Sequence, residues 1–317
     1  MTPPPSVSAL LIRARAGDRP ALARLISMIE ARAPGVSEAL DTLVPRRLHT
    51  PGAPHVIGIT GPPGAGKSTF VDRLVQHARA AGERVAVVAV DPSSPWSGGA
   101  ILGDRIRMER HAEDPGVYVR SLASRGHLGG LSRAAGQTVD VLDAVGFDRV
   151  LVETVGVGQG ELAVMEVADT VLVVLTPESG DSVQTMKAGL LEIADVFCVN
   201  KADRPGADHL RRDLEQAVHL DDRAGWHAPV HTSVALEDRG VDETLASLEA
   251  HRAWCVGEGR PGWEARRAEG RVRIYLDLMA EAAREQARRA LAGSDLLDDL
   301  RAGRVRPEHA SARSRPT

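Results

Sequence analysis

The stretch that decides the fold is Gly61–Thr69, which reads Gly-Pro-Pro-Gly-Ala-Gly-Lys-Ser-Thr and fits the pattern G-x-x-x-x-G-K-[ST]. Ahead of it, His55–Thr60 reads as a buried strand, and behind it apolar residues recur at the spacing of one helix face. A glycine-rich loop between a strand and a helix can aim backbone N–H groups at phosphate oxygens. The sequence therefore predicts a nucleoside triphosphate site of the phosphate-loop type.

The residues of this loop have separate predicted roles. We expect Lys67 to reach the β- and γ-phosphates and the Ser68 hydroxyl to bind Mg²⁺. The glycines permit turns that a Cβ would forbid and let the backbone approach the anion. The whole loop is predicted to contact the nucleotide, through Gly61, Pro62, Pro63, Gly64, Ala65, Gly66, Lys67, Ser68 and Thr69.

The composition limits the partners of the chain. The 317 residues have a formal net charge of −4 and no long block of one sign, so we predict no nucleic-acid partner. No apolar run approaches the length of a membrane-spanning helix, so we predict no membrane partner. Cys198 and Cys255 lie far apart and outside any metal-binding pattern, which disfavours a disulfide framework and favours a soluble, cytoplasmic setting.

Carboxylates follow two further strands predicted from apolar runs. The predicted strand Val85–Val90 is followed directly by Asp91, which lies at the strand end where open α/β sheets bind their ligands. Arg149–Val152 delivers Glu153, and Gly156 follows at the spacing typical of phosphate-loop proteins. In such proteins the acid is the second carboxylate of the site and the glycine contacts the γ-phosphate.

A guanine-recognition pattern follows the strand predicted at Val196–Val199. Asn200-Lys201-Ala202-Asp203 is an N-K-x-D turn. The Asp203 carboxylate can accept hydrogen bonds from the guanine N1–H and 2-amino groups, a donor pair that adenine lacks. After a further short strand at Val230–Thr232, four residues are expected to close over the base with their backbone amides: Ser233, Val234, Ala235 and Leu236. The sequence predicts GTP as the ligand.

Five segments together resemble one family. The long string Asp91–Met108 is the most specific, and Arg125–Ser132, Glu153–Gln159, Gly180–Gly189 and Asn200–Asp203 agree with it. The chain thereby resembles the MeaB/ArgK family of GTPases. This resemblance implies an α/β phosphate-loop GTPase with a mostly parallel central sheet at residues 51–256. It also implies a helical N-terminal extension at residues 1–50, and a helical dimerisation arm and tail at residues 257–317.

The resemblance also implies roles for single residues. Asp91, Asp104 and Glu153 correspond to the carboxylates that bind Mg²⁺ with Ser68 or organise water. The catalytic residues implied are Lys67, Asp104, Gly156 and Lys187. A third switch region that responds to nucleotide and partner corresponds to Asp181, Gln184 and Lys187.

The resemblance further implies a biological role. It implies that the cofactors are GTP or GDP and Mg²⁺ and that the chain forms a homodimer. It also implies that the partner is an adenosylcobalamin-dependent acyl-CoA mutase, such as methylmalonyl-CoA mutase. GTP hydrolysis would gate cofactor loading and protect or reactivate that enzyme. Methylmalonyl-, isobutyryl- and ethylmalonyl-CoA mutases all remain open as the client.

Two positions depart from the expected pattern. Val157 follows Gly156 where Ras-like GTPases have a glutamine that orients water, with Gln159 two residues later. Because valine cannot orient water, we predict slow intrinsic hydrolysis that a partner accelerates. In the base-closing loop, Val234 occupies the apparent place of a serine, with Ser233 just before it.

Three alternatives stay open. A nickel-insertion GTPase shares this type of core, but it calls for a tract of histidines or paired metal ligands, and the histidines here are scattered. A transport-linked kinase needs a phosphoacceptor site and a transfer base, neither of which the sequence shows. An inert GTP-dependent scaffold would bind the nucleotide without turning it over.

Overall fold

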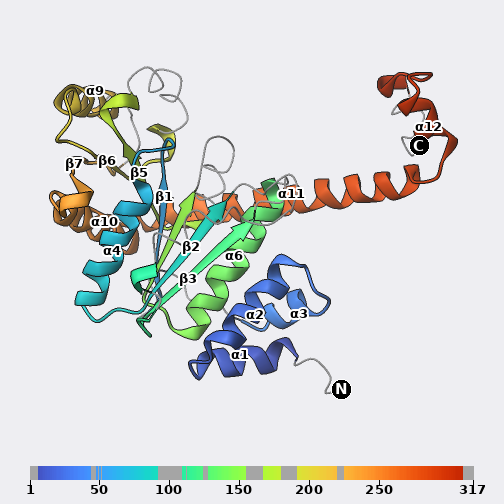
Figure 1. The fold of residues 1–317 in the computed structure, drawn as a ribbon, viewed down its shortest axis with the longest axis horizontal. Helices are drawn as coiled ribbons and strands as arrows, with labels where there is room; N and C mark the ends of the chain where they lie inside the picture. Colours follow the sequence, from blue (N-terminus) through green and yellow to red (C-terminus); the bar gives the residue numbers. More distant parts are fainter. Residues whose placement is uncertain are drawn as a thin grey trace. The chain divides into compact units, whose positions relative to one another are not determined.

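The core of the protein is a seven-stranded sheet in the order β3-β2-β4-β1-β5-β6-β7 (Figure 1). The computed structural model describes residues 6–43, 48, 50, 52–91, 109–111, 113–123, 128–154, 167–179, 191–219 and 225–309. Every strand pair in the sheet is parallel. The strands are β1 (His55–Thr60), β2 (Val85–Asp91), β3 (Val117–Ala123), β4 (Arg149–Thr154), β5 (Thr170–Leu175), β6 (Val196–Val199) and β7 (Val230–Thr232).

Helices cover both faces of the sheet, and each face has its own apolar core. On one face, strand residues pack with α6 (Leu128–Val145), α9 (Ala207–His219) and the N-terminal helices. On the other face they pack with α4 (Lys67–Ala80) and α10 (Val241–Val256). Strands covered on both faces read as unbroken apolar runs, which is why these strands could be predicted from the sequence. The predicted α/β class with a mostly parallel sheet is confirmed.

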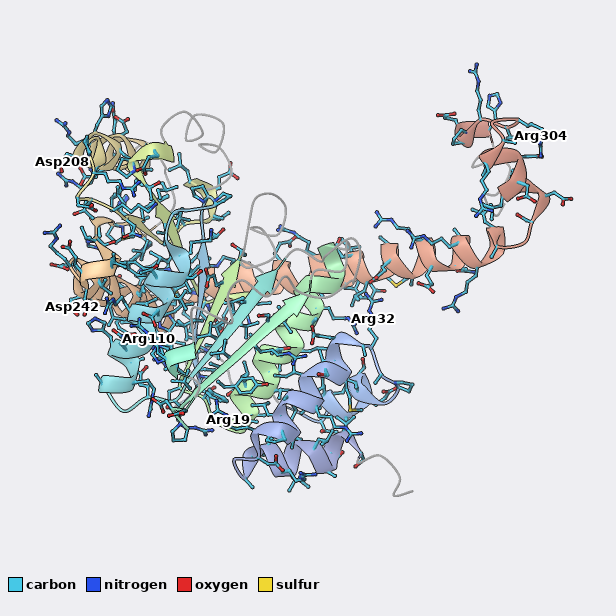
Figure 2. The ribbon with its side chains drawn as sticks, in the orientation of Figure 1. Arg19, Arg32, Arg110, Asp208, Asp242 and Arg304 are labelled. Carbon is cyan, nitrogen blue, oxygen red and sulfur yellow. The ribbon has the colours of Figure 1, made fainter. Side chains whose placement is uncertain are left out.

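The N-terminal extension is tied to the sheet by side chains as well as by apolar packing. It consists of α1 (Val7–Arg15), α2 (Arg19–Glu30) and α3 (Val36–Leu40), and the side chains of Ser6 and Asp18 cap α1 and α2. Arg19 donates to the carbonyl oxygens of Asp114 (3.2 Å) and Val117 (2.5 Å) at the start of β3 (Figure 2). The extension is therefore part of the α6 side of the core.

The C-terminal region begins with a sharp break between two helices. Gly257 caps α10, and the long helix α11 runs from Arg260 to Leu291. A short α12 follows at Asp295–Arg301. Backbone contacts divide the chain into two compact units, Met1–Ile274 and Tyr275–Thr317. The predicted domain boundaries after residues 50 and 256 stay predictions.

The helices of the described residues were also considered as membrane spans. None of them combines the length and the apolarity that crossing a bilayer requires.

Candidate nucleotide-binding site

The phosphate loop connects β1 to α4 and takes a shape that only glycine allows at two positions. Gly61 has a φ of +137°, and a Cβ there would lie 2.0 Å from the Val174 carbonyl oxygen. Gly66 has a φ of +86°, and a Cβ there would lie 2.4 Å from Asn200 Nδ2. Both positions therefore need glycine for conformation and for space. The loop lies against β5 on one side and against the turn after β6 on the other.

Lys67 begins α4 and is buried within the loop. Its ammonium group donates to the carbonyl oxygens of Gly61 (2.7 Å) and Pro62 (3.0 Å). A buried ammonium needs acceptors that replace water, and the loop carbonyls supply them. The positive charge is thus held at the loop that is expected to bind phosphate, as the motif predicts.

Ser68 and Glu153 form a buried pair beside the loop. The Ser68 hydroxyl donates to Glu153 Oε1 over 2.7 Å, and both residues are almost fully buried. Glu153 lies near the carboxyl end of β4, and Asp91 ends the neighbouring strand β2. Hydroxyl and carboxylate oxygens are the ligands that Mg²⁺ prefers, so these residues fit the predicted metal site.

Asn200 joins the phosphate loop to the base-closing loop. Its amide Nδ2 donates to the Ala65 carbonyl oxygen over 2.9 Å. Its Oδ1 accepts from the Ser233 hydroxyl (3.1 Å) and from the Ala235 backbone N–H (3.0 Å). One buried side chain therefore fixes the two halves of the site relative to each other.

Ser233, which precedes Val234, supplies the hydroxyl of the base-closing loop that donates to Asn200. Both residues are buried, and the Ser233 hydroxyl also lies 3.1 Å from Cys198 Sγ. Since the backbone of Ser233 pairs with Val199 and Ala202, this serine closes the loop onto the N-K-x-D turn.

The N-K-x-D turn holds its other two motif residues close to solvent. Lys201 has a φ of +56°, a left-handed conformation that turns the chain sharply after β6. Asp203 is exposed, so its carboxylate does not belong to the buried core. The predicted base-recognition residues Asn200, Lys201, Asp203 and Ser233 are thus gathered at the carboxyl end of β6.

Several predicted site residues lie outside the described residues. They are Asp104, Gly156, Asp181, Gln184 and Lys187, together with Val157 and most of the Asp91–Met108 string. Their assignments stay predictions.

The sequence did not reveal a contact between α4 and the segment that follows the Asp91–Met108 string. Asp72, one turn after Ser68 on α4, accepts from His111 Nε2 over 2.8 Å and also pairs with Arg110. Arg110 and His111 belong to the short helix η1 (Glu109–His111). The short helix that follows that string in the sequence is therefore anchored to the helix that carries Lys67 and Ser68.

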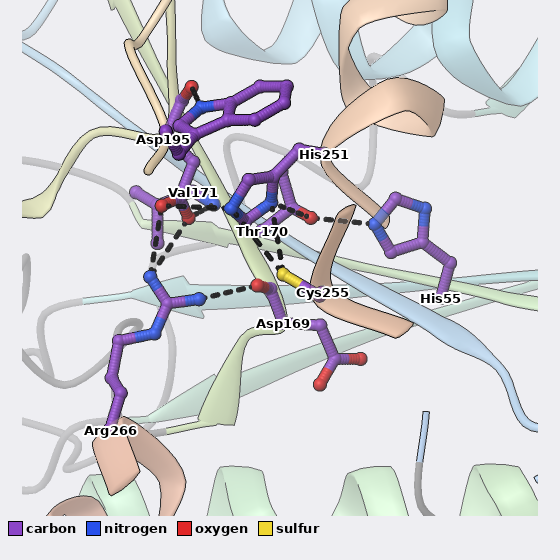
Figure 3. Close-up of polar contacts among 9 residues, drawn as sticks. His55, Asp169, Thr170, Val171, Asp195, His251, Cys255 and Arg266 are labelled. Carbon is purple, nitrogen blue, oxygen red and sulfur yellow. Dashed lines mark hydrogen bonds and ion pairs between the residues drawn. The ribbon is translucent and has the colours of Figure 1, made fainter. Parts of the chain in front are cut away.

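A second polar cluster lies at the opposite edge of the sheet, where the strands begin (Figure 3). The Thr170 hydroxyl lies 2.8 Å from His55 Nε2 and 2.9 Å from His251 Nδ1. His251 Nε2 is 3.3 Å from Asp195 Oδ1, and Asp195 pairs with Arg266 of α11 over 3.0 Å. This cluster, His55–Thr170–His251–Asp195–Arg266, is called the amino-edge network below.

The electrostatics of the amino-edge network are those of a structural core. Burial lowers the pKa of His251 to about 4 and raises the pKa of the Cys255 thiol to about 12, so both are neutral at pH 7. Among the described residues, no group of three or more His, Cys, Asp or Glu side chains is placed to hold a metal ion. No motif marks this network, because its five members come from five separate segments.

The fold and the site define the class of the protein. A parallel sheet with a phosphate loop, a buried Ser–Glu pair and an N-K-x-D turn is the architecture of a phosphate-loop GTPase. The family model described as "Methylmalonyl Co-A mutase-associated GTPase MeaB" matches residues 22–291. The chain belongs to this family, and it is a GTPase.

Individual relatives agree with that assignment. The GTPase ArgK of Escherichia coli (strain K12) is 38% identical over 78% of this chain and 76% of its own length. The mitochondrial methylmalonic aciduria type A homolog of Mus musculus is also 38% identical, over 77% of this chain and 62% of its own length. A solved structure named LAO/AO transport system kinase is 27% identical, with a TM-score of 0.70 over 99% of this chain and 97% of that one.

Proposed function

We propose that this GTPase is a chaperone of an adenosylcobalamin-dependent acyl-CoA mutase, with methylmalonyl-CoA mutase as the first client to test. GTP hydrolysis gates the loading of the cofactor and protects or reactivates the mutase. The observation that carries the proposal is the match of residues 22–291 to a family whose description names a methylmalonyl-CoA mutase-associated GTPase. The mouse relative, whose name refers to methylmalonic aciduria, supports the same client. We place this role in the cytoplasm, where GTP and acyl-CoA substrates are available.

The site geometry supports the nucleotide half of the proposal. Lys67 holds positive charge in the loop, and Asn200 fixes the loop to the N-K-x-D turn. Ser68, Glu153 and Asp91 are the residues we expect to bind Mg²⁺, which when bound would neutralise charge on the phosphates. Asp203 would accept from the guanine N1–H and 2-amino groups, with the loop Ser233–Leu236 over the base.

The predicted switch residues support the regulatory half of the proposal. Val157 stands where a water-orienting glutamine would be, so we expect slow basal hydrolysis. A client that reorders Asp104, Gly156 and the region of Asp181, Gln184 and Lys187 would then accelerate it. The link between α4 and η1 through Asp72 holds η1, which follows the string in the sequence, to the helix that carries Lys67 and Ser68.

We also propose a homodimer formed through α11. Tyr275, Leu276 and Met279 are 60%, 59% and 53% exposed and lie at helical spacing on one side of this helix. Exposed apolar stripes of this kind are typical of interaction surfaces. Light scattering should give twice the mass of the chain for the wild type and the monomer mass for Leu276→Glu/Met279→Glu. A wild-type monomer would contradict this part of the proposal.

The experiment that tests the proposal is GTP turnover by the purified protein, alone and with methylmalonyl-CoA mutase. We expect slow basal turnover that rises clearly when the mutase is added. Lys67→Ala should lower the stimulated rate on the order of 100-fold, because it removes a charge that stabilises the transferring phosphate. Fast basal turnover that ignores the mutase would overturn the proposal.

One alternative has a specific observation behind it, the name LAO/AO transport system kinase of the similar solved structure. A kinase passes the γ-phosphate to an acceptor, whereas the proposed GTPase passes it to water. Labelled γ-phosphate followed in the same assay separates the two. Label on protein or amino acid, with no free phosphate, would favour the kinase.

A further inference from the structure

Arg73 ties the phosphate-binding helix to the base-closing loop. It lies on α4 less than two turns after Lys67 and points its guanidinium at η3 (Ala235–Glu237). Its Nε donates to the Ala235 carbonyl oxygen over 2.8 Å, and one terminal nitrogen donates to the Leu236 carbonyl oxygen over 2.6 Å. The other terminal nitrogen donates to Gln76 over 2.9 Å, which holds the side chain in this orientation.

A second side chain of α4 supports the other end of the same loop. His77, one turn beyond Arg73, lies 3.1 Å from Asp238 Oδ1 and 3.2 Å from Asp242 Oδ1. Asp238 ends η3 with a φ of +58°, where the chain turns back. The helix η3 is therefore held to α4 at the carbonyls of Ala235 and Leu236 and again at Asp238, where it ends.

These contacts fix the direction of the backbone amides in the loop. In a planar trans peptide the C=O and the following N–H point to opposite sides. Because the Ala235 carbonyl faces Arg73, the Leu236 N–H points away from α4. The Ala235 N–H is fixed from the other side by Asn200 Oδ1, 3.0 Å away. Arg73 and Asn200 together leave these peptide groups a single orientation.

We infer that Arg73 is a positioning residue for guanine specificity. By holding the Ala235 carbonyl, it orients the Leu236 N–H, the amide of the loop proposed to read the base, and it does so from the helix that carries Lys67 and Ser68. Loss of Arg73 lets the loop swing, so that the base dissociates faster while the phosphates are still bound. The inference rests on the proposed role of Ser233–Leu236 in base recognition.

The test compares Arg73→Met with Arg79→Met. Arg79 lies on the same helix and pairs with Asp114 at 2.8 and 3.0 Å, away from the base-closing loop. Affinities for GDP, ADP and pyrophosphate, and the dissociation rate of GDP, are measured for both variants and the wild type. We expect Arg73→Met to weaken GDP binding about tenfold, through faster dissociation, and to leave pyrophosphate binding unchanged. The ratio of GDP to ADP affinity should fall by the same factor, whereas Arg79→Met should keep the wild-type ratio.

Each other outcome has one meaning. An equal loss for GDP, ADP and pyrophosphate would show that Arg73 supports the fold alone and would overturn the inference. Unchanged GDP binding would overturn it as well. If Arg73→Met does not fold, Arg73→Gln, which can reach one carbonyl, should give a smaller fall in the same ratio. A wild-type protein that does not prefer GDP to ADP would instead contradict the proposed base site.

Discussion

The amino edge and the carboxyl edge of the sheet use polar residues in opposite ways. At the amino edge, where β1, β4, β5 and β6 begin, charged groups of the protein pair with one another: the buried Arg149 pairs with Glu83 and Glu249, and the buried Asp195 pairs with Arg266. At the carboxyl edge, the polar groups are organised by a loop whose glycines adopt conformations that other residues avoid and by one amide, Asn200. The amino edge thus holds the fold together, whereas the carboxyl edge holds groups in place for a ligand.

This difference predicts which property of the protein a substitution at each edge should change. A buried polar group whose partners are protein groups contributes to the unfolding free energy when it is removed. Removal of a polar group that contacts a ligand changes the affinity for that ligand or the reaction rate, and it leaves the unfolding free energy nearly unchanged. If the two edges act separately, substitutions at the amino edge should change stability alone and substitutions at the carboxyl edge should change ligand binding alone. The largest effect is expected at the amino edge.

Asp195→Ala should have the largest effect, on stability. Asp195 accepts from Arg266 and from the Val171 backbone N–H (2.8 Å), so its loss leaves a partly buried guanidinium without its carboxylate. Breaking a fully buried pair from one side costs about 3–5 kcal/mol of unfolding free energy, and for this partly exposed pair we expect the lower end of that range. Urea denaturation measures this loss, and GDP affinity is measured on the folded protein.

The control for Asp195→Ala is Glu215→Ala. Glu215 pairs with Arg211 on α9 at 2.7 Å, with both side chains 39% exposed, and such a pair contributes at most about 1 kcal/mol. We expect GDP affinity to be unchanged in both variants. A weaker affinity for GDP in Asp195→Ala would mean that the two edges are coupled through β6.

Asp203→Asn should have a smaller effect, on base choice. The asparagine amide can donate to the 2-oxo group of xanthine but cannot accept the pair of donors that guanine offers. Affinity for GDP should fall on the order of 100-fold, and xanthosine diphosphate should become the better ligand. The melting temperature should stay constant, because Asp203 is exposed.

Asp208→Asn is the matched control for this change. Asp208 is an exposed aspartate in the first turn of α9 (Figure 2), and it lies outside the N-K-x-D turn. It should keep the preference for GDP. If Asp203→Asn also kept that preference, the carboxyl edge would not read the base through this turn.

The smallest expected effect is on the pH dependence of stability. Burial lowers the pKa of His251 to about 4, so the unfolded chain takes up a proton first, and stability falls as the pH drops from about 6.5 toward 4. Burial raises the pKa of Asp140, on α6, to about 6, so protonation of this carboxyl stabilises the fold in nearly the same range. The two contributions oppose each other in the wild type.

Asp140→Asn removes one of these contributions and should expose the other. The variant should be more stable than the wild type at pH 7.5, and this advantage should shrink by roughly 1 kcal/mol at pH 5. Thermal and urea unfolding at the two pH values measure the change. Parallel pH profiles for the variant and the wild type would contradict it.

Much of the fold could be predicted because its strands are apolar runs. The strands Val196–Val199 and Val230–Thr232 have the bounds that the sequence indicated. β4 runs two residues further than expected, to Thr154, because Glu153 and Thr154 pair with β1 and β2. The order of the strands depends on contacts between distant segments, and no local pattern encodes it.

The helix α6 shows a limit of local propensity. Gly129 and Gly130 have low helix propensity, yet both lie inside α6, which begins at Leu128. Each glycine costs about 1 kcal/mol in a helix, which the remainder of an 18-residue helix packed on the sheet can offset.

The candidate site likewise contains residues that could be predicted from the sequence and residues that could not. Lys67, Ser68 and Asn200 could be predicted because each belongs to a motif with fixed spacing. Arg73 could not, because its partners are backbone carbonyls more than a hundred residues away. The amino-edge network could not be predicted either. Its members come together only after the sheet has formed; they include His55, Thr170, His251 and Arg266.

The position of β1 has a consequence for synthesis of the chain. β1 carries the phosphate loop, yet its neighbours are β4 and β5, with His55 opposite Arg149 and Ile57 opposite Thr170. As the chain leaves the ribosome, this apolar strand has no partner until β4 and β5 have been made, and unpaired strands of this kind promote aggregation. The nucleotide site is therefore completed late during translation, and a chain released before β4 exposes the strand on which the site is built.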